Sequence, residues 1–146
     1  MKVFLGSDHA GFGLKEEIKK HLHKKGFEVQ DLGTDSEEST DYPDYAAKVA
    51  KNVASGKGAL GIVVCGTGTG TAIAANKVYG IRAAQATSVY LAQMAREHND
   101  ANVLSLGSRV TKTKEALKMV DAFLSTPFSN EERHRRRIQK ISRIEK

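Results

Sequence analysis

Several features are scarce in this sequence of 146 residues, and each scarcity excludes a class of protein. A single cysteine, Cys65, excludes an internal disulfide and any zinc site built from several cysteines, which fits a reducing compartment. No apolar run approaches the roughly 20 residues that a membrane-spanning helix needs. The first residues turn polar after a handful of apolar ones, as in a first strand rather than a secretory signal. We therefore expect a cytoplasmic protein with a free thiol and no membrane partner.

Internal repeats and low-complexity segments are missing as well, so we expect one domain over residues 1–146. The glycine-rich stretch 66–70 is not a dinucleotide fingerprint, because Thr71 stands where the third glycine belongs. The net charge is +6, with much of the excess in the tail RHRRRIQKISRIEK. An anionic partner is expected, but no aromatic residues alternate with these arginines, which disfavours nucleic acid.

Short apolar runs alternate with longer segments of helical period, which predicts βαβ units and a parallel sheet of an α/β protein. Strands are expected at 2–6, 27–31, 61–64, 81–84 and 102–106. Helices are expected at 12–25, 42–54, 88–97, 113–124 and 130–145, and another helix opens after the glycine stretch. The polar segment 33–41 reads as a surface loop. The last helix carries Ile138, Ile141 and Ile144 on one face although the fold is already closed, so this face needs a partner.

Ligands of open parallel sheets bind outside the carboxyl ends of the strands, which directs attention to the residues that follow each strand. Glycines 66, 68 and 70 follow Cys65, and without Cβ atoms they let backbone N–H groups turn towards an oxyanion. The alternative is that they only permit a tight turn. Cys65 either packs as a small buried residue or, at a strand end before this loop, ionises readily enough to take a proton from carbon.

Further polar residues leave two interpretations open. Asp8 and His9 follow the first strand and could meet a ligand hydroxyl and a phosphate, or Asp8 could cap the next helix. His98 and Asn99 lie between a helix and the last strand, either as ligand contacts or in a helix-ending turn with a left-handed asparagine. Arg133 and Arg137 are four residues apart on one helical face, suited either to bidentate phosphate contacts or to a solvated basic helix.

The segments SDHAGFGLK, DYPDYA, CGTGTGTAIAANK, GIRAA, REHNDANVLSLGSR and ERHRRRI resemble, in this order, the type B ribose-5-phosphate isomerase family, which includes allose- and galactose-6-phosphate isomerases. The resemblance covers nearly the whole chain. It implies a three-layer α/β/α fold, Rossmann-like, whose C-terminal helix packs on a neighbouring subunit. It also implies a homodimer, or a tetramer, with sites shared between subunits and with no metal ion and no cofactor.

The resemblance also implies roles for individual residues. Cys65 would be the base that moves a proton between C2 and C1, Thr67 would shuttle a hydroxyl proton, and His98 would open the sugar ring. The substrate-binding residues would be Asp8, His9, Tyr42, Gly66, Gly68, Thr69, Gly70, Asn99, Arg109, Arg133 and Arg137. Among these, the glycine loop would hold the enediolate oxygen, while His9 and the three arginines would bind the phosphate.

Two features differ from the pattern of many family members. Some members use a glutamate at the position of Thr71 as their base, so this chain resembles the cysteine type. Glu131 and Glu132 precede Arg133 where many members have two glycines, which affects the reach of the tail arginines. The expected reaction is interconversion of D-ribose 5-phosphate and D-ribulose 5-phosphate. The alternatives are a six-carbon sugar phosphate, such as allose 6-phosphate or galactose 6-phosphate, and, more distantly, an RNA- or nucleotide-binding module.

Overall fold

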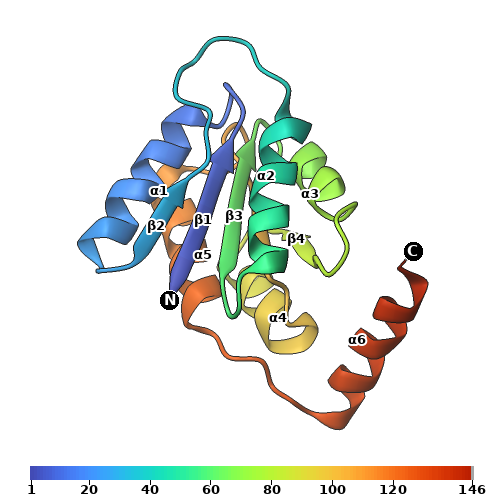
Figure 1. The fold of residues 1–146 in the computed structure, drawn as a ribbon. Helices are drawn as coiled ribbons and strands as arrows, with labels where there is room; N and C mark the ends of the chain where they lie inside the picture. Colours follow the sequence, from blue (N-terminus) through green and yellow to red (C-terminus); the bar gives the residue numbers. More distant parts are fainter. Residues whose placement is uncertain (146) are drawn as a thin grey trace.

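A five-stranded parallel sheet forms the middle layer of the computed structural model, which describes residues 1–145 (Figure 1). The strands are β1 (Lys2–Ser7), β2 (Glu28–Asp31), β3 (Leu60–Cys65), β4 (Ala83–Gln85) and β5 (Val103–Gly107). The helices are α1 (Phe12–Lys24), α2 (Tyr42–Ser55), α3 (Thr69–Ala75), α4 (Val89–Asn99), α5 (Thr113–Ser125) and α6 (Glu132–Ile144). Helices cover both faces of the sheet, which confirms the predicted α/β class.

The order of the strands reverses between β1 and β3. Neighbours in the sheet run β2-β1-β3-β5-β4, and every pair is parallel. From β1 the chain moves outward to β2, whereas from β3 it builds the other half of the sheet. Ligand crevices of such sheets open where the order reverses, outside the carboxyl ends of the two strands. The residues that follow β1 and β3 are therefore placed to line a site.

Alternation of side chains along the strands builds one apolar layer on each face. Val3 and Leu5 of β1 pack in the layer that contains Phe123 of α5, while Phe4 packs in the opposite layer with Val49 of α2. All five are at most 5% exposed. Neither layer includes a residue of α6 among the residues that the structure describes. The sheet and its first five helices thus bury their core without the last helix.

Helix α6 lies apart from the sheet and meets the rest of the chain at the end of α4 (Figure 1). Ile141 and Ile144 are 42% and 76% exposed, so the predicted apolar face stays open in a single chain. These two side chains line a cavity of about 820 Å³ together with Leu91 and Met94 of α4. No helix within residues 1–145 is long and apolar enough to cross a membrane.

The prediction for the end of the fourth helix was wrong by two residues. Helix α4 continues through His98 and Asn99, and Asp100, not Asn99, takes the left-handed conformation with φ 44°. Arg82 supports the two added residues, because its Nε donates a hydrogen bond to the Asn99 carbonyl at 2.9 Å. Arg96 Nη1 donates to Asp100 Oδ1, also at 2.9 Å. These contacts satisfy polar groups at the helix end that sequence spacing alone does not reveal.

Candidate active site

Cys65 ends β3 at the carboxyl edge of the sheet and is only 4% exposed. Its sulfur nevertheless has polar neighbours. The Gly68 N–H donates a hydrogen bond to Sγ at 3.2 Å, and Thr71 Oγ1 also lies 3.2 Å from Sγ. A cysteine that acts only as a small buried hydrophobe needs no such partners. The contacts therefore favour a thiol that is held in position for chemistry.

The loop after Cys65 takes a path that only glycine permits at two positions. Gly68 has φ 83°, and a Cβ there would lie 2.9 Å from the backbone carbon of Leu106. A Cβ on Gly70 would lie 2.5 Å from the ring of Tyr42. The first intrahelical bond of α3 runs from the Ala72 N–H to the Gly68 carbonyl, so earlier amides have no acceptor within the helix. Since α3 has only 7 residues, an oxyanion here would depend on loop amides more than on a helix dipole.

Asp8 and His9 follow β1 next to this loop. The Asp8 N–H donates to the Val64 carbonyl at 3.3 Å, which joins the segment to β3. Asp8 Oδ1 accepts from the Gly11 N–H at 3.0 Å, so the residue does cap the turn before α1 with one oxygen. His9 Nδ1 accepts from the Thr40 N–H at 3.1 Å. In the neutral ring the hydrogen then resides on Nε2, which can donate to an anion.

Arg109 and Tyr42 complete this edge of the sheet. The Arg109 N–H donates to the Gly66 carbonyl at 2.9 Å, and its Nη1 would lie 3.0 Å from a Cβ at Gly66, so the guanidinium lies beside the loop. Tyr42 begins α2 with its ring against Gly70. The structure thus gathers Cys65, the glycine loop and the predicted residues of β1, α2 and the β5 end. A guanidinium, a carboxylate, two rings with donor atoms and a thiol thus lie along this edge.

Gln85 also belongs to this edge, although the sequence analysis did not select it. Its Nε2 donates to the Thr67 carbonyl and to Thr69 Oγ1, both at 3.0 Å. Thr67 itself is exposed, and its Oγ1 accepts from the Thr69 N–H at 3.3 Å. The position of Gln85 at the carboxyl end of β4 was the signal that could have identified it. Gln85 holds the loop that carries the proposed hydroxyl shuttle.

His98 and Asn99 lie at the opposite edge of the same sheet. They end α4 directly before β5 begins at Val103, whereas Cys65 pairs with Gly107 at the other end of β5. The length of β5, five residues, separates the two edges by about 16 Å at the usual rise of a parallel strand. The structure therefore does not bring His98 and Cys65 of one chain together.

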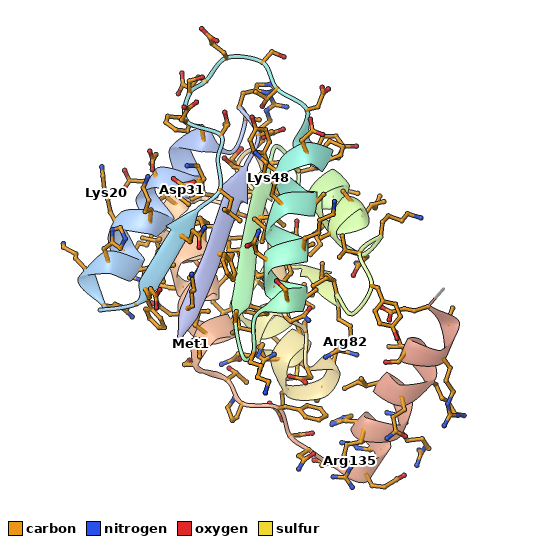
Figure 2. All side chains as sticks on the ribbon, in the orientation of Figure 1. Met1, Lys20, Asp31, Lys48, Arg82 and Arg135 are labelled. Atoms are coloured by element: carbon orange, nitrogen blue, oxygen red, sulfur yellow. The ribbon has the colours of Figure 1, made fainter. Side chains whose placement is uncertain are left out.

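The tail arginines lie at the same far edge as His98. Figure 2 shows Arg135, in the first turns of α6, at the end of the molecule away from the 33–41 loop. Arg133 Nε donates to Glu131 Oε2 at 2.8 Å, an exposed ion pair. The Arg133 guanidinium holds the pKa of Glu131 below its ordinary value, mainly through this hydrogen bond. Glu131 is thus the present partner of Arg133, a residue that the sequence analysis predicted to bind phosphate.

His134 is a buried residue of α6 that the sequence analysis did not single out. Its ring stacks on His98 with centroids 4.5 Å apart, and Ser129 Oγ lies 2.5 Å from its Nδ1. Only 3% of the residue is exposed. Desolvation lowers the pKa of His134 from its ordinary 6.5, and the positive charge of Arg133 lowers it further. A second histidine on the His98 ring fixes the orientation of that ring.

The lowered pKa of His134 predicts a loss of stability in mild acid. The unfolded chain takes up this proton at a higher pH than the folded chain, so the free energy of unfolding falls as the pH drops through about 6.5. Urea unfolding of wild type and His134→Gln at about pH 8 and pH 5 measures the effect. The pH-dependent loss is expected to be smaller in His134→Gln. His23→Gln, at an exposed histidine of α1, serves as the control and should behave like the wild type. An identical loss in His134→Gln would contradict the assignment.

The parallel α/β sheet, with a thiol beside a glycine loop at its switch point, is the arrangement of an enzyme that acts on small molecules. The chain belongs to the ribose/galactose isomerase family, whose family model matches residues 3–141.

Named relatives agree with this assignment. The chain is 50% identical over 144 residues to ribose-5-phosphate isomerase B of Escherichia coli, covering 99% of this chain and 96% of the relative. The solved ribose-5-phosphate isomerase B of Clostridium thermocellum superposes with a TM-score of 0.96 at 54% identity, covering 99% of this chain and 97% of that one. The enzyme of Mycoplasma genitalium with bound ribulose-5-phosphate has a TM-score of 0.92 at 46% identity, covering 97% and 94%.

Proposed function

We propose that this protein interconverts D-ribose 5-phosphate and D-ribulose 5-phosphate, with Cys65 as the base. The observation that carries the proposal is the Cys65 sulfur at the carboxyl end of β3, where the strand order reverses, held by the Gly68 amide beside a glycine loop and the Arg109 guanidinium. The family and the relatives named for this activity support it, among them one solved with bound ribulose-5-phosphate.

Each site is proposed to combine the carboxyl edge of one chain with the far edge of a second copy. One copy supplies Cys65, Thr67, Asp8, Tyr42 and the loop 66–70, and the second copy supplies His98 and Asn99. This division follows from the separation of the two edges, since a base and a ring-opening histidine must both reach one sugar. Helix α6 of each copy, with its open face of Ile141 and Ile144, is proposed to pack against the other copy.

The reaction begins with ring opening, for which His98 transfers a proton between the ring oxygen and the anomeric hydroxyl. Asp8 and Asn99 orient sugar hydroxyls. The Cys65 thiolate then removes the proton from C2: the C–H bond breaks, the S–H bond forms, and the electron pair passes into the enediolate. The loop amides stabilise the enediolate oxygen, an interaction worth several kcal/mol for preorganised donors. Thr67 moves the proton between the two substrate oxygens, and Cys65 returns its proton to C1.

The phosphate is proposed to lie between both copies. His9 and Arg109 approach it from the copy that carries the thiol, and Arg133 and Arg137 approach from the other. His9 is oriented for this contact, because its Nδ1 is occupied by the Thr40 amide. Planar guanidinium groups match phosphate oxygens in bidentate geometry.

The competition between Glu131 and phosphate for Arg133 gives a testable prediction. Glu131→Gln is expected to lower KM for the sugar phosphate about two- to fivefold, the range of an exposed ion pair, with kcat little changed. Glu132→Gln is a matched control, because it removes the same charge from the same turn but releases Arg136, its partner at 2.6 Å. Equal changes in both variants would show a general charge effect and would contradict a specific role of Glu131.

The activity is tested by incubating the protein with ribose 5-phosphate in the presence of a chelator and no nucleotide, and by following ribulose 5-phosphate. Turnover that the chelator does not reduce is expected, which also tests the predicted independence from metal. Allose 6-phosphate and galactose 6-phosphate are assayed in parallel. Turnover of a six-carbon substrate without turnover of ribose 5-phosphate would replace the proposed substrate.

A further inference from the structure

A cluster of three polar side chains, Cys65, Thr71 and Ser105, interrupts the apolar layer between the sheet and α3. Cys65 is 4% exposed, and Thr71 and Ser105 are fully buried. Side chains alternate along β3 and β5, so Cys65 and Ser105 share the face on which Val63 and Val103 pack. Thr71 approaches this face from α3. Hydroxyl groups in such a layer are costly unless every hydrogen has a partner.

The hydrogen bonds of the cluster form a chain. Ser105 Oγ lies 2.7 Å from the Gly68 carbonyl and 2.7 Å from Thr71 Oγ1. Thr71 Oγ1 lies 3.2 Å from the Cys65 sulfur. The Gly68 N–H donates to the same sulfur. Both ends of the chain of hydrogen bonds therefore meet at Gly68. Its N–H donates to the sulfur, and its carbonyl accepts from Ser105.

The Thr71 hydroxyl hydrogen can be directed differently in the two protonation states of Cys65, because it lies within reach of the sulfur and of Ser105 Oγ. When Cys65 is a thiol, its S–H donates to Thr71, Thr71 donates to Ser105, and Ser105 donates to the Gly68 carbonyl. When Cys65 is a thiolate, Thr71 donates to the sulfur, and Ser105 keeps its hydrogen bond to the Gly68 carbonyl. The sulfur anion then accepts two hydrogen bonds, from Thr71 and from the Gly68 amide. The change between the two states needs only a rotation of the Thr71 hydroxyl hydrogen, without movement of any heavier atom.

We propose that Thr71 is a positioning residue that stabilises the thiolate of Cys65 by donating its hydroxyl hydrogen to the sulfur. The proposal rests on the proposed function, in which Cys65 is the base. In each turnover the sulfur takes the C2 proton and then returns it to C1, so it alternates between thiolate and thiol. A Thr71 hydroxyl that rotates between Ser105 and the sulfur serves both states. Ser105 keeps the Thr71 hydroxyl satisfied while Cys65 is protonated.

Other charged groups at this edge are the Arg109 guanidinium, the Asp8 carboxylate and the His9 ring, and none of them belongs to the chain of hydrogen bonds. Arg109 approaches from the end of β5, while Asp8 and His9 approach from the end of β1. Substitutions at Thr71 leave these groups in place. A change in the thiolate population of a Thr71 variant therefore reports the lost hydroxyl.

The test uses the fact that Cys65 is the only thiol of the chain, so ultraviolet thiolate absorbance reports this residue alone. Thr71→Val keeps the shape of the side chain and removes the hydroxyl, and Thr71→Ser keeps the hydroxyl. The thiolate fraction at neutral pH is expected to fall about tenfold in Thr71→Val, the scale of one hydrogen bond to a charged group. Thr71→Ser should stay close to wild type. Thr71→Ala replaces the valine variant if the latter does not fold.

Turnover adds an independent readout. In Thr71→Val, kcat is expected to fall at neutral pH and to recover as the pH is raised, with KM unchanged. Two results would overturn the proposal even if Cys65 proves essential. One is a thiolate titration of Thr71→Val that matches wild type. The other is a thiolate titration of Thr71→Ser that is shifted as far as that of Thr71→Val. Failure of the proposed function looks different: wild type would form no ribulose 5-phosphate, and the titration would still decide the role of Thr71.

Discussion

Replacement of Cys65 by alanine is expected to lower kcat for ribose 5-phosphate by roughly 10²- to 10⁴-fold, the usual contribution of a positioned acid or base. KM should change little, because the phosphate and hydroxyl contacts come from other residues. Steady-state kinetics with purified variants measures both constants. A loss confined to kcat identifies an interaction that is made only in the transition state.

Cys65→Ser is the matched control for packing. Its hydroxyl can keep the contacts to the Gly68 amide and to Thr71, but serine does not ionise near neutral pH. The serine variant should therefore fold like wild type and lose nearly as much activity as the alanine variant. Near wild-type turnover in either variant would mean that another group removes the proton.

Mixing two inactive variants is expected to restore activity. In a dimer of one Cys65→Ala chain and one His98→Asn chain, one site carries both changes and the other carries neither. Random exchange of chains makes half of the dimers mixed, so the mixture should reach about one quarter of wild-type turnover with ring-closed ribose 5-phosphate. The assay follows activity after the chains are dissociated and reassociated together.

The control for this experiment pairs two changes at the same edge of the sheet. Chains with Cys65→Ala and chains with Arg109→Ala should not complement, because each site of a mixed dimer then carries one of the two changes. Restored activity in the mixture of Cys65→Ala and Arg109→Ala chains would contradict the proposed sharing of the site between two copies. So would a lack of restored activity in the mixture of Cys65→Ala and His98→Asn chains.

Most helices and strands could be predicted from the sequence, because each one shows a periodic pattern of apolar residues. The spacing of Leu14, Ile18 and Leu22 predicted α1, and all three are buried. The strand predicted at 81–84 starts later, at Ala83, because Ile81 packs in the core and the Asn76 side chain bonds to both backbone groups of Ala83. Such a contact between a side chain and the backbone seven residues along the chain has no periodic signal in the sequence.

The candidate site was only partly predictable for the same reason. Polar residues after strands marked Asp8, His9 and the loop beyond Cys65, since topology alone brings these ends together. The sequence could not show that His98 lies a full strand length from the thiol of its own chain. Ser105, a lone hydroxyl in the buried run VLSLG, was visible in the sequence, but its meaning depends on Thr71 and Gly68, which reach it only in the folded chain.

The central claim is that the sulfur of Cys65 carries the proton between C2 and C1. The most direct measurement follows deuterium uptake at C1 of ribulose 5-phosphate by NMR, with wild type and Cys65→Ser in deuterated water. When the S–H hydrogen exchanges with solvent between the two transfers, the proposed mechanism brings deuterium to C1, and it predicts uptake with wild type at a rate at least about 10²-fold higher than with Cys65→Ser. Uptake at the same rate with both proteins would contradict it.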